Sequence, residues 1–301
     1  MLEMRASGIL AVLSLAAVLA GCGSAGSTST RARPPRPRPL AVYAAGKRIE
    51  VLRPGRRWTG LPHRIEVRRG RANLNLAVRL DRARRMVRRA LAAHETRVDL
   101  PVLSLSATIG LRPIRQALHN DCEATALSML LAAAGVHVGQ LELQARLPRS
   151  GPLDPEPGQD GGLFRWGDPE RGFVGRPAGG GTEGGFGVYE PPIRALAARY
   201  GVHLLDLHGR GVGAVRAAVL AGHPVLAWVG LAAGPYLSWL TPSGHEITVN
   251  LDEHAIVLVG AGPGYVLVDN PLTGRRERWG EELFSYRWKL LGRRALELPR
   301  Y

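Results

Sequence analysis

The order of apolar and polar residues in the first third of the chain predicts a small module of strands and one helix. Residues 41–52, 63–70 and 74–80 alternate apolar with polar side chains, which is the period of a strand with one buried face. The apolar run at 96–107 predicts a further strand. A helical segment at 81–93 interrupts these strands, so the expected order is strand, helix, strand.

Residues 81–93 repeat apolar side chains at helical spacing, with Asp81 in the position of an N-cap. The stripe that we expect to be buried consists of Ala83, Met86, Val87, Ala90 and Leu91. The opposite face carries Arg82, Arg85, Arg88 and Arg89. A solvated basic face is one interpretation of this pattern, and a face that binds an anionic surface is the other.

A second, more apolar helix is predicted within residues 115–135. Asn120 and Asp121 are good N-cap residues, and Gly135 is a natural C-terminal stop. The apolar positions at helical spacing are Leu127, Leu130, Leu131 and Ala134. Cys122 therefore lies in the first turn of a buried helix.

The C-terminal third predicts an antiparallel hairpin. The apolar run that begins at His254 and the run that ends at Asn270 flank a turn at residues 262–264. The start of the first strand then lies beside the end of the second, which brings His254 close to Asp269 and Asn270. Before this hairpin we expect helices at 191–200 and 212–221 and a buried strand at 224–232.

Composition separates the chain into a basic and a neutral part. The chain has 301 residues, with 40 Lys and Arg against 25 Asp and Glu, a net charge of +15. Residues 31–100 hold 20 basic and 5 acidic side chains, which accounts for the whole net charge. No nucleic-acid recognition motif accompanies this charge, so we expect no nucleic-acid partner. Anionic cell-wall polymer or lipid headgroups are the partners that the basic part would suit.

The first residues have the features of a secretory signal. Arg5 precedes an apolar stretch at 9–20, which is shorter than the roughly 20 residues that a membrane-spanning helix needs. The segment ends Leu19-Ala20-Gly21-Cys22, which resembles the lipobox of bacterial lipoproteins. The resemblance implies that Cys22 becomes the lipidated first residue of a protein anchored in the membrane on its extracytoplasmic side; an ordinary signal peptide is the alternative. Residues 23–40, rich in Gly and Ser and then in Pro and Arg, form the expected linker.

Candidate chemistry centres on Cys122. The positive end of a helix favours a thiolate over a thiol, which suits a nucleophile. Gln116 precedes the helix by one loop, where its amide could donate to a developing oxyanion. His254 is the candidate general base, because the predicted hairpin supplies it with a polar partner. The long Gly- and Pro-rich segment 151–187, with interspersed aromatic residues, is a candidate lid or cleft wall.

These motifs together resemble the papain-like cysteine peptidases that cleave bacteriocin leader peptides after a double glycine, and above all their stand-alone bacterial relatives. The similar segments lie between residues 105 and 300, and they include QALHNDCEATALSMLLAAAG, LDEHAIVLVGAG and VLVDNPLTG. The resemblance implies Cys122 as nucleophile, His254 as general base and Gln116 as oxyanion donor. It does not cover the basic module.

The third catalytic residue departs from the family pattern. Most relatives have Asn-Asp-Pro where this chain has Asp269-Asn270-Pro271. The residue before Pro is the usual partner of the His, which favours Asn270. A change of one residue in strand register would instead bring Asp269 to His254.

The sequence thus predicts an α+β, papain-like domain at 106–301, after a signal segment (1–22), a linker (23–40) and a basic module (41–105). The expected activity is cleavage of peptide bonds in a peptide or protein substrate. A cell-wall amidase or transpeptidase on the same scaffold, or a non-catalytic binding lipoprotein of the cell envelope, are the alternatives. No metal-ligand cluster or nucleotide motif stands out in the sequence, so we expect no metal and no cofactor.

Overall fold

The structure is a computed structural model that describes residues 38–53, 60, 64–69, 71–158, 161–179 and 184–299. The predicted signal segment, Cys22 and nearly all of the linker lie outside these residues. Among the described helices, none is both long enough and apolar enough to cross a membrane.

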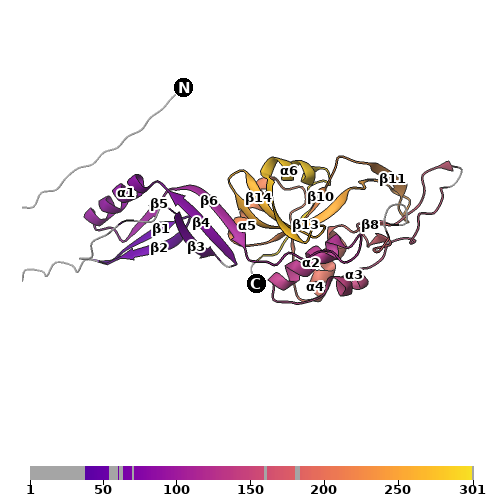
Figure 1. Cartoon of the computed structure of the whole chain (residues 1–301), viewed down its shortest axis with the longest axis horizontal. Coiled ribbons are helices and arrows are strands. Elements are labelled where there is room, and N and C mark those ends of the chain that lie inside the picture. Colours follow the sequence, from indigo (N-terminus) through magenta and orange to yellow (C-terminus); the bar gives the residue numbers. More distant parts are fainter. Residues whose placement is uncertain are drawn as a thin grey trace, which may run out of the picture. The chain divides into compact units, whose positions relative to one another are not determined.

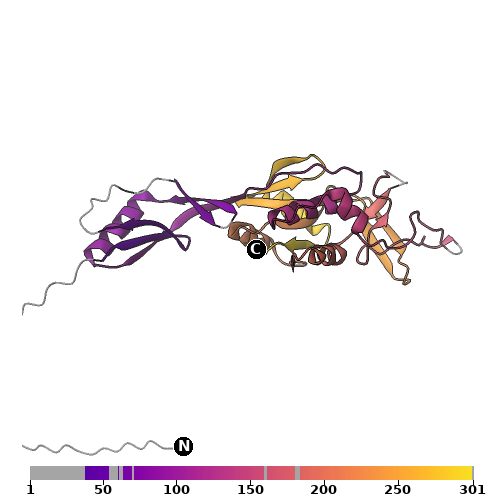
Figure 2. The ribbon, with the colours of Figure 1, turned by 90° about the horizontal axis from the view of Figure 1, so that it is seen from below.

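The basic module contains a three-stranded sheet covered by one helix. Strands β1 (Leu40–Ala44) and β2 (Lys47–Leu52) are antiparallel, and β5 (Arg97–Leu100) runs parallel to β1. Helix α1 (Leu80–Ala92) packs on β1 and β5 (Figures 1 and 2). The predicted helix is therefore present. The single strand predicted at 41–52 is instead a hairpin that turns at Ala45 and Gly46, both with positive φ, and the strand predicted at 96–107 is divided at Pro101 into β5 and a later strand that begins at Val102.

Two details of α1 differ from the sequence prediction. The helix begins at Leu80 and its N-cap is Arg79, so Asp81 lies inside the first turn and does not cap the helix. The reason is that Arg79, directly after a strand, already has the extended backbone of an N-cap residue. Leu91 is 40% exposed and does not belong to the buried stripe, because its position falls at the edge of the face centred on Ala83, Val87 and Ala90.

The second sheet is larger and carries the candidate site. In spatial order it contains β3 (Arg64–Arg69), β4 (Ala72–Val78), β6 (Val102–Ile109), β13 (Glu253–Gly262), β10 (Val225–Gly230), β16 (Ala295–Glu297) and β9 (Leu205–Asp206). Strand β14 (Tyr265–Asn270) pairs with β13, and β15 (Arg275–Gly280) pairs with β14. The predicted boundary between residues 105 and 106 lies inside β6, which pairs with β4 along its length and with β13 at its end.

Helices cover this sheet on both faces. Figure 1 shows α2 (Cys122–Ala133), α3 (Gln140–Arg146) and α4 (Glu190–Arg199) on one side of β10 and β13, and α6 (Glu281–Lys289) on the other. Helix α5 (Val212–Ala221) packs against β13 and β6. The predicted helices and the predicted strand at 224–232 are thus confirmed in place.

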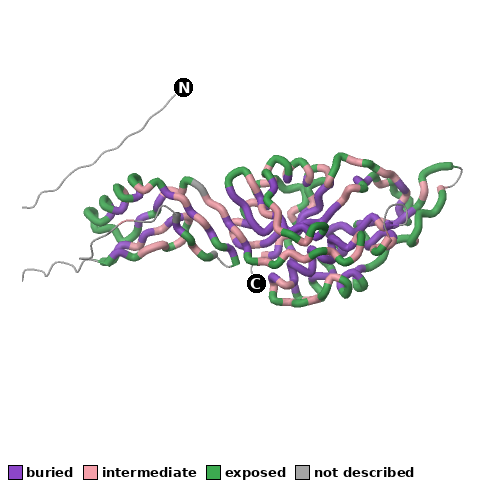
Figure 3. The backbone as a smooth tube through the Cα atoms, viewed as in Figure 1, coloured by how far each residue is buried: buried purple, intermediate pink, exposed green. Residues whose placement is uncertain are grey.

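Helix α2 is the central helix of the core. Nearly every one of its residues is buried, and Figure 3 shows buried backbone through the middle of this part of the chain. The helix ends where predicted, because Gly135 has a φ of +84° that other residues adopt at a cost. Burial on all sides fixes the position of its first residue, Cys122.

Short elements complete the described chain. Strands β11 (Tyr236–Leu240) and β12 (Glu246–Asn250) form a hairpin, and β7 (Val174–Gly175) pairs with β8 (Gly185–Gly187). The last pair lies inside the predicted lid or cleft-wall segment.

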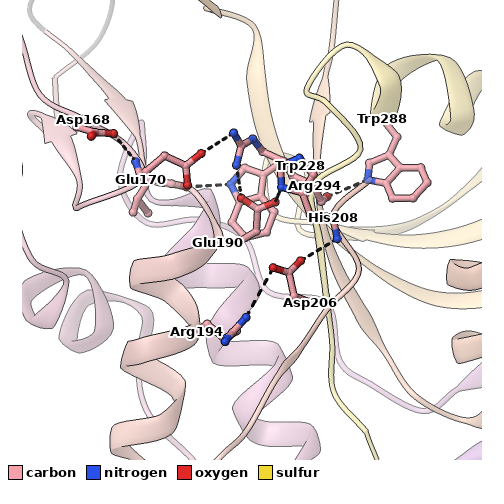
Figure 4. Close-up of polar contacts among 10 residues, drawn as sticks. Asp168, Glu170, Glu190, Arg194, Asp206, His208, Trp228, Trp288 and Arg294 are labelled. Atoms are coloured by element: carbon pink, nitrogen blue, oxygen red, sulfur yellow. Dashed lines mark hydrogen bonds and ion pairs between the residues drawn. The ribbon is translucent and has the colours of Figure 1, made fainter. Parts of the chain in front are cut away.

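A charged network joins α4 to the last strand. The Arg294 guanidinium donates to Glu190 at 2.5 Å and pairs with Glu170 at 2.6 Å (Figure 4). It also lies over the ring of Tyr189 at 3.8 Å. The Arg294 carbonyl accepts from the backbone N–H of Trp228 on β10. These contacts hold α4 and its neighbouring loop against the sheet, behind the candidate site.

Candidate active site

The nucleophile candidate begins α2, as the sequence predicted. Asp121 is the N-cap residue, and its buried Oδ1 accepts from the backbone N–H of Leu118 at 3.0 Å. This contact closes the loop that leads into the helix. The Cys122 side chain is consequently held at the start of a rigid, buried helix.

The predicted hairpin brings His254 to Asn270. Nε2 of His254 lies 2.8 Å from Oδ1 of Asn270, and both residues are buried. Nδ2 of Asn270 donates to Oε1 of Glu277 on β15 at 3.0 Å. Because the carboxylate of Glu277 only accepts, it sets the direction of the Asn270 amide, and Nε2 of His254 must be the donor. Nδ1 of His254 is then the unprotonated nitrogen, available as a base.

Asp269, the alternative partner, points elsewhere. Its carboxylate is fully buried and receives two hydrogen bonds from the Arg276 guanidinium, at 2.7 and 2.8 Å. Arg276 also donates to the backbone carbonyl of Leu111. The structure therefore brings Asn270, and not Asp269, against His254.

Gln116 lies at the site, but its amide has local partners. Nε2 donates to the carbonyls of Leu118 and His119 at 3.0 and 2.7 Å, and Oε1 is buried without a partner among the described residues. The backbone N–H of Gln116 donates to the carbonyl of Pro271 at 2.9 Å. This bond ties the loop before α2 to the strand end that carries Asn270.

The surroundings of Cys122 favour its thiol form, which opposes the sequence expectation that the helix start stabilises a thiolate. Burial raises the pKa of Cys122 well above its usual value, and the carboxylates of Glu123 and Glu253 raise it further. Sγ donates to Oε2 of Glu123 at 3.3 Å and accepts from the N–H of Ala255 at 3.5 Å. The structure describes both Cys122 and His254, and it shows no hydrogen bond between their side chains. Burial also lowers the pKa of His254 to about 4, so its resting state is the neutral imidazole.

Cys122 and His254 both line a small cavity of about 160 Å³. Among its lining residues are Gln116, Cys122, Glu123, Glu253, His254 and Asp252. Beside it lies a larger, mainly apolar cavity of about 700 Å³, which shares Phe186 and Leu251 with the first. Phe164 and Trp166 line the larger cavity, so the described part of segment 151–187 provides one of its walls.

Three acidic residues at the site were not identified from the sequence. Glu123 and Glu253 are the sequence neighbours of Cys122 and His254, and Glu277 lies seven residues after Asn270. A carboxylate next to a candidate catalytic residue was a signal in the sequence, but only tertiary packing shows that it points into the site. Cys122, Glu123 and Glu253 offer one ligand atom each within 4.8 Å of one another, the single such group of potential metal ligands in the described part of the chain. The expected absence of a metal stays a prediction.

A buried helix that begins with Cys, packed on an antiparallel sheet that carries a His–Asn pair, defines the papain-like class of α+β proteins. The chain belongs to the Peptidase_C39 like family, whose sequence model matches residues 108–296. The basic module lies outside that match.

Two relatives support this assignment. The uncharacterized protein YvpB of Bacillus subtilis (strain 168) is 33% identical over 189 residues, which is 61% of this chain and 70% of YvpB. A crystal structure described as a C39-like peptidase from Bacillus anthracis is similar with a TM-score of 0.55 and 27% identity, over 64% of this chain and 96% of that one.

Proposed function

We propose that this protein is a cysteine peptidase that cleaves peptide bonds through an acyl-thioester on Cys122. The observation that carries the proposal is the His254–Asn270 contact of 2.8 Å beside a cavity that Cys122 also lines. It leaves Nδ1 of His254 as the free base. Family membership supports the same activity.

The proposed reaction begins with transfer of the thiol proton to Nδ1 of His254. The thiolate then attacks the carbonyl carbon of the scissile bond, and the Gln116 amide, rotated away from the carbonyls of Leu118 and His119, donates to the oxyanion. The imidazolium returns its proton to the leaving amine, which departs and leaves the acyl group on sulfur. Water, deprotonated by His254, finally hydrolyses the thioester.

The experiment is cleavage profiling with an unbiased peptide library and, in parallel, with cell-wall muropeptides. The protein used is the chain that begins at residue 23. Cleavage of library peptides, lost in His254→Ala by about 10²-fold or more, supports the peptidase, since this is the scale of a general base. Turnover of muropeptides alone supports the amidase alternative, and turnover of neither supports a binding lipoprotein.

We further propose that Cys22 anchors the chain by lipid on the extracytoplasmic side of a bacterial membrane. The support is the lipobox-like sequence before Cys22. Two acyl chains on one Cys, together with a basic arm, are enough for stable anchoring.

A further inference from the structure

The cavity at Cys122 is lined by acids and by no lysine or arginine. Its acidic lining residues are Glu123, Asp252 and Glu253, and the remaining titratable ones are His119, Cys122 and His254. Elsewhere in the described part of the chain, the acids Glu281, Asp269 and Glu190 each face an Arg side chain. A charge that the protein leaves uncompensated at a substrate cavity selects the charge of the substrate.

Glu123 is fixed in place more firmly than a surface acid. Its side chain is fully buried, Oε1 accepts from the backbone N–H of Val188 at 2.7 Å, and Oε2 accepts from the Cys122 thiol at 3.3 Å. The thiol proton is thus directed to a carboxylate and not to the imidazole. In this arrangement Glu123 holds the nucleophile in its resting form.

Glu253 is the second acid at the thiol, and one of its carboxyl oxygens is an unsatisfied hydrogen-bond acceptor. Its Oε1 is buried and has no hydrogen-bond partner among the described residues. Gly187 lies close to both acids. A Cβ at this position would lie 2.2 Å from Oε1 of Glu123 and 3.2 Å from Oε2 of Glu253, so a larger residue would intrude on the pair. A buried acceptor without a donor costs free energy, and a cationic donor from the substrate would remove that cost.

We propose that Glu123 and Glu253 determine specificity by binding a cationic group of the substrate beside the scissile bond, and that this group releases Cys122 from its resting form. The cation would be a protonated amine or a guanidinium. Its positive charge cancels one negative charge of the pair, and that negative charge opposes thiolate formation. The inference deepens the proposed function and rests on it, because it requires Cys122 as nucleophile.

Other charged groups around the pair do not remove its negative charge. Burial and Glu123 raise the pKa of Glu253, and only Arg294 opposes them; burial raises the pKa of Glu123 to about 7, with a smaller contribution from Asp121. Tyr189 faces Glu253 and remains a neutral phenol, because burial raises its pKa. His254 is neutral as well.

The test measures the reactivity of Cys122 toward methanethiosulfonate reagents of different charge. The chain that begins at residue 23 contains Cys122 as its one cysteine. The reagents are the cationic 2-aminoethyl, the neutral methyl and the anionic 2-sulfonatoethyl forms, and each rate is divided by the rate of the same reagent with free cysteine. We expect the cationic-to-neutral ratio to exceed that of free cysteine by about tenfold, the effect of one unit of thiol pKa.

Three variants with confirmed folding complete the experiment. Glu253→Gln and Glu123→Gln keep the shape of the side chain, and both should bring the ratio close to that of free cysteine. Glu123→Gln should also move the reactivity of the thiol to lower pH, which a merely structural role would not do. Glu246→Gln, on the exposed start of β12, is the matched control and should leave the ratio unchanged.

Equal ratios in the wild type and in Glu253→Gln overturn the inference. The second readout is the rate of peptide hydrolysis. It compares peptides that carry Lys at each position around the cleavage site with peptides that carry acetyl-lysine at the same position. Hydrolysis without preference for Lys contradicts the inference and leaves the proposed function intact. Charge-selective labelling without any hydrolysis contradicts the proposed function instead, and retains the carboxylate pair as a cation site at the thiol.

Discussion

At the scale of single residues, Asn270 decides the chemistry of His254. Its Oδ1 accepts from His254 and from the backbone N–H of Leu272, while its Nδ2 donates to Glu277. The sequence left Asn270 and Asp269 open because strand parity was unknown. The pairing of β13 with β14 has a register shift between Leu258 and Gly260, which no residue pattern in the sequence announces.

We predict that Asn270→Ala lowers kcat by about 10- to 100-fold with little change in KM, since it misorients the base and touches no substrate. Glu277→Ala should act in the same direction but less strongly, because Asn270 keeps its bond to His254. Steady-state kinetics on one cleaved peptide measures both. Glu282→Ala, an exposed acid on α6, is the control, and an equal loss there would contradict the positioning role.

Glu277 also binds its neighbours in its charged form. Burial alone would raise its pKa, but hydrogen bonds from Thr273, Trp279 and Asn270 lower it. Glu277→Gln should therefore retain more activity than Glu277→Ala, because the Gln oxygen can still accept from Asn270. The comparison of the two variants separates the hydrogen bond from the charge.

The raised pKa of Glu123 has a consequence for stability. A carboxyl whose pKa is about 7 in the folded chain, against an ordinary 4.5, binds its proton more tightly when folded. Its contribution to stability is therefore present below about pH 4.5 and is lost as the pH rises toward 7. His254 has the opposite effect, since its lowered pKa makes protonation below about pH 6.5 destabilising.

We predict that Glu123→Gln becomes more stable relative to the wild type as the pH rises from about 4.5 to above 7. The measured quantity is the free energy of unfolding of the variant minus that of the wild type. The gain should be on the order of 3 kcal/mol, and the comparison cancels the effect of His254. Urea denaturation at several pH values measures it. A difference that does not change with pH would show that Glu123 titrates normally.

At the scale of elements, the hairpin and α2 follow from the sequence, and the surroundings of the site do not. Period and turn residues place His254 at a strand start and Cys122 at a helix start. Gly187 on β8 had no comparable signal, although it passes next to Glu123 at the first turn of α2. Contacts between distant segments depend on packing that periodicity does not encode.

Gly187→Ala should disrupt the site. Its φ is +120°, and a Cβ there would lie 2.2 Å from Oε1 of Glu123. We expect a loss of more than about 1 kcal/mol of stability, as for strained backbone positions, together with altered Cys122 reactivity. Gly139→Ala, which meets nothing within 4 Å, should be nearly neutral in thermal unfolding and in labelling.

Helix α1 presents a second, independent surface. Arg82, Arg85 and Arg89 line a shallow cavity on its exposed face, and none of them takes part in an ion pair within the described chain. We predict that changing these three arginines to Glu weakens binding to phosphatidylglycerol vesicles at low salt. The effect should shrink at high salt, because exposed charges are screened.

Vesicle co-sedimentation with the chain that begins at residue 23 measures this binding. The matched control changes Arg199, Arg275 and Lys289, three exposed cations outside the basic module, to Glu. If both triple variants lose vesicle binding to the same extent, the binding depends on net charge in general and not on the arginines of α1. Unchanged binding in the α1 variant would leave its arginines as a solvated face.

At the scale of the whole molecule, charge and fold divide the chain at different places. The excess of Arg ends near residue 100, whereas strand β6 continues from the basic module into the sheet that carries His254. Composition predicts the division by charge, but it could not predict a shared strand, since β6 contains no charged residue that would assign it to either part. Removal of the whole module would therefore expose an edge of the larger sheet.

The proposed lipid anchoring is tested by a change at Cys22. Cys22→Ser should move the protein from the membrane fraction to the soluble extracellular fraction, because both acyl chains depend on this sulfur. Fractionation of cells that express the wild type and the variant measures it. A Cys22→Ser protein that stays with the membrane would contradict lipid anchoring.

The central claim is that Cys122 is the nucleophile of a peptidase, and the most direct measurement is peptide hydrolysis by Cys122→Ala. Wild type and variant are compared at equal concentration, with the same library and with folding confirmed by circular dichroism. We expect cleavage by the wild type and none above background by Cys122→Ala. A folded Cys122→Ala protein that cleaves the same peptides at the wild-type rate would contradict it.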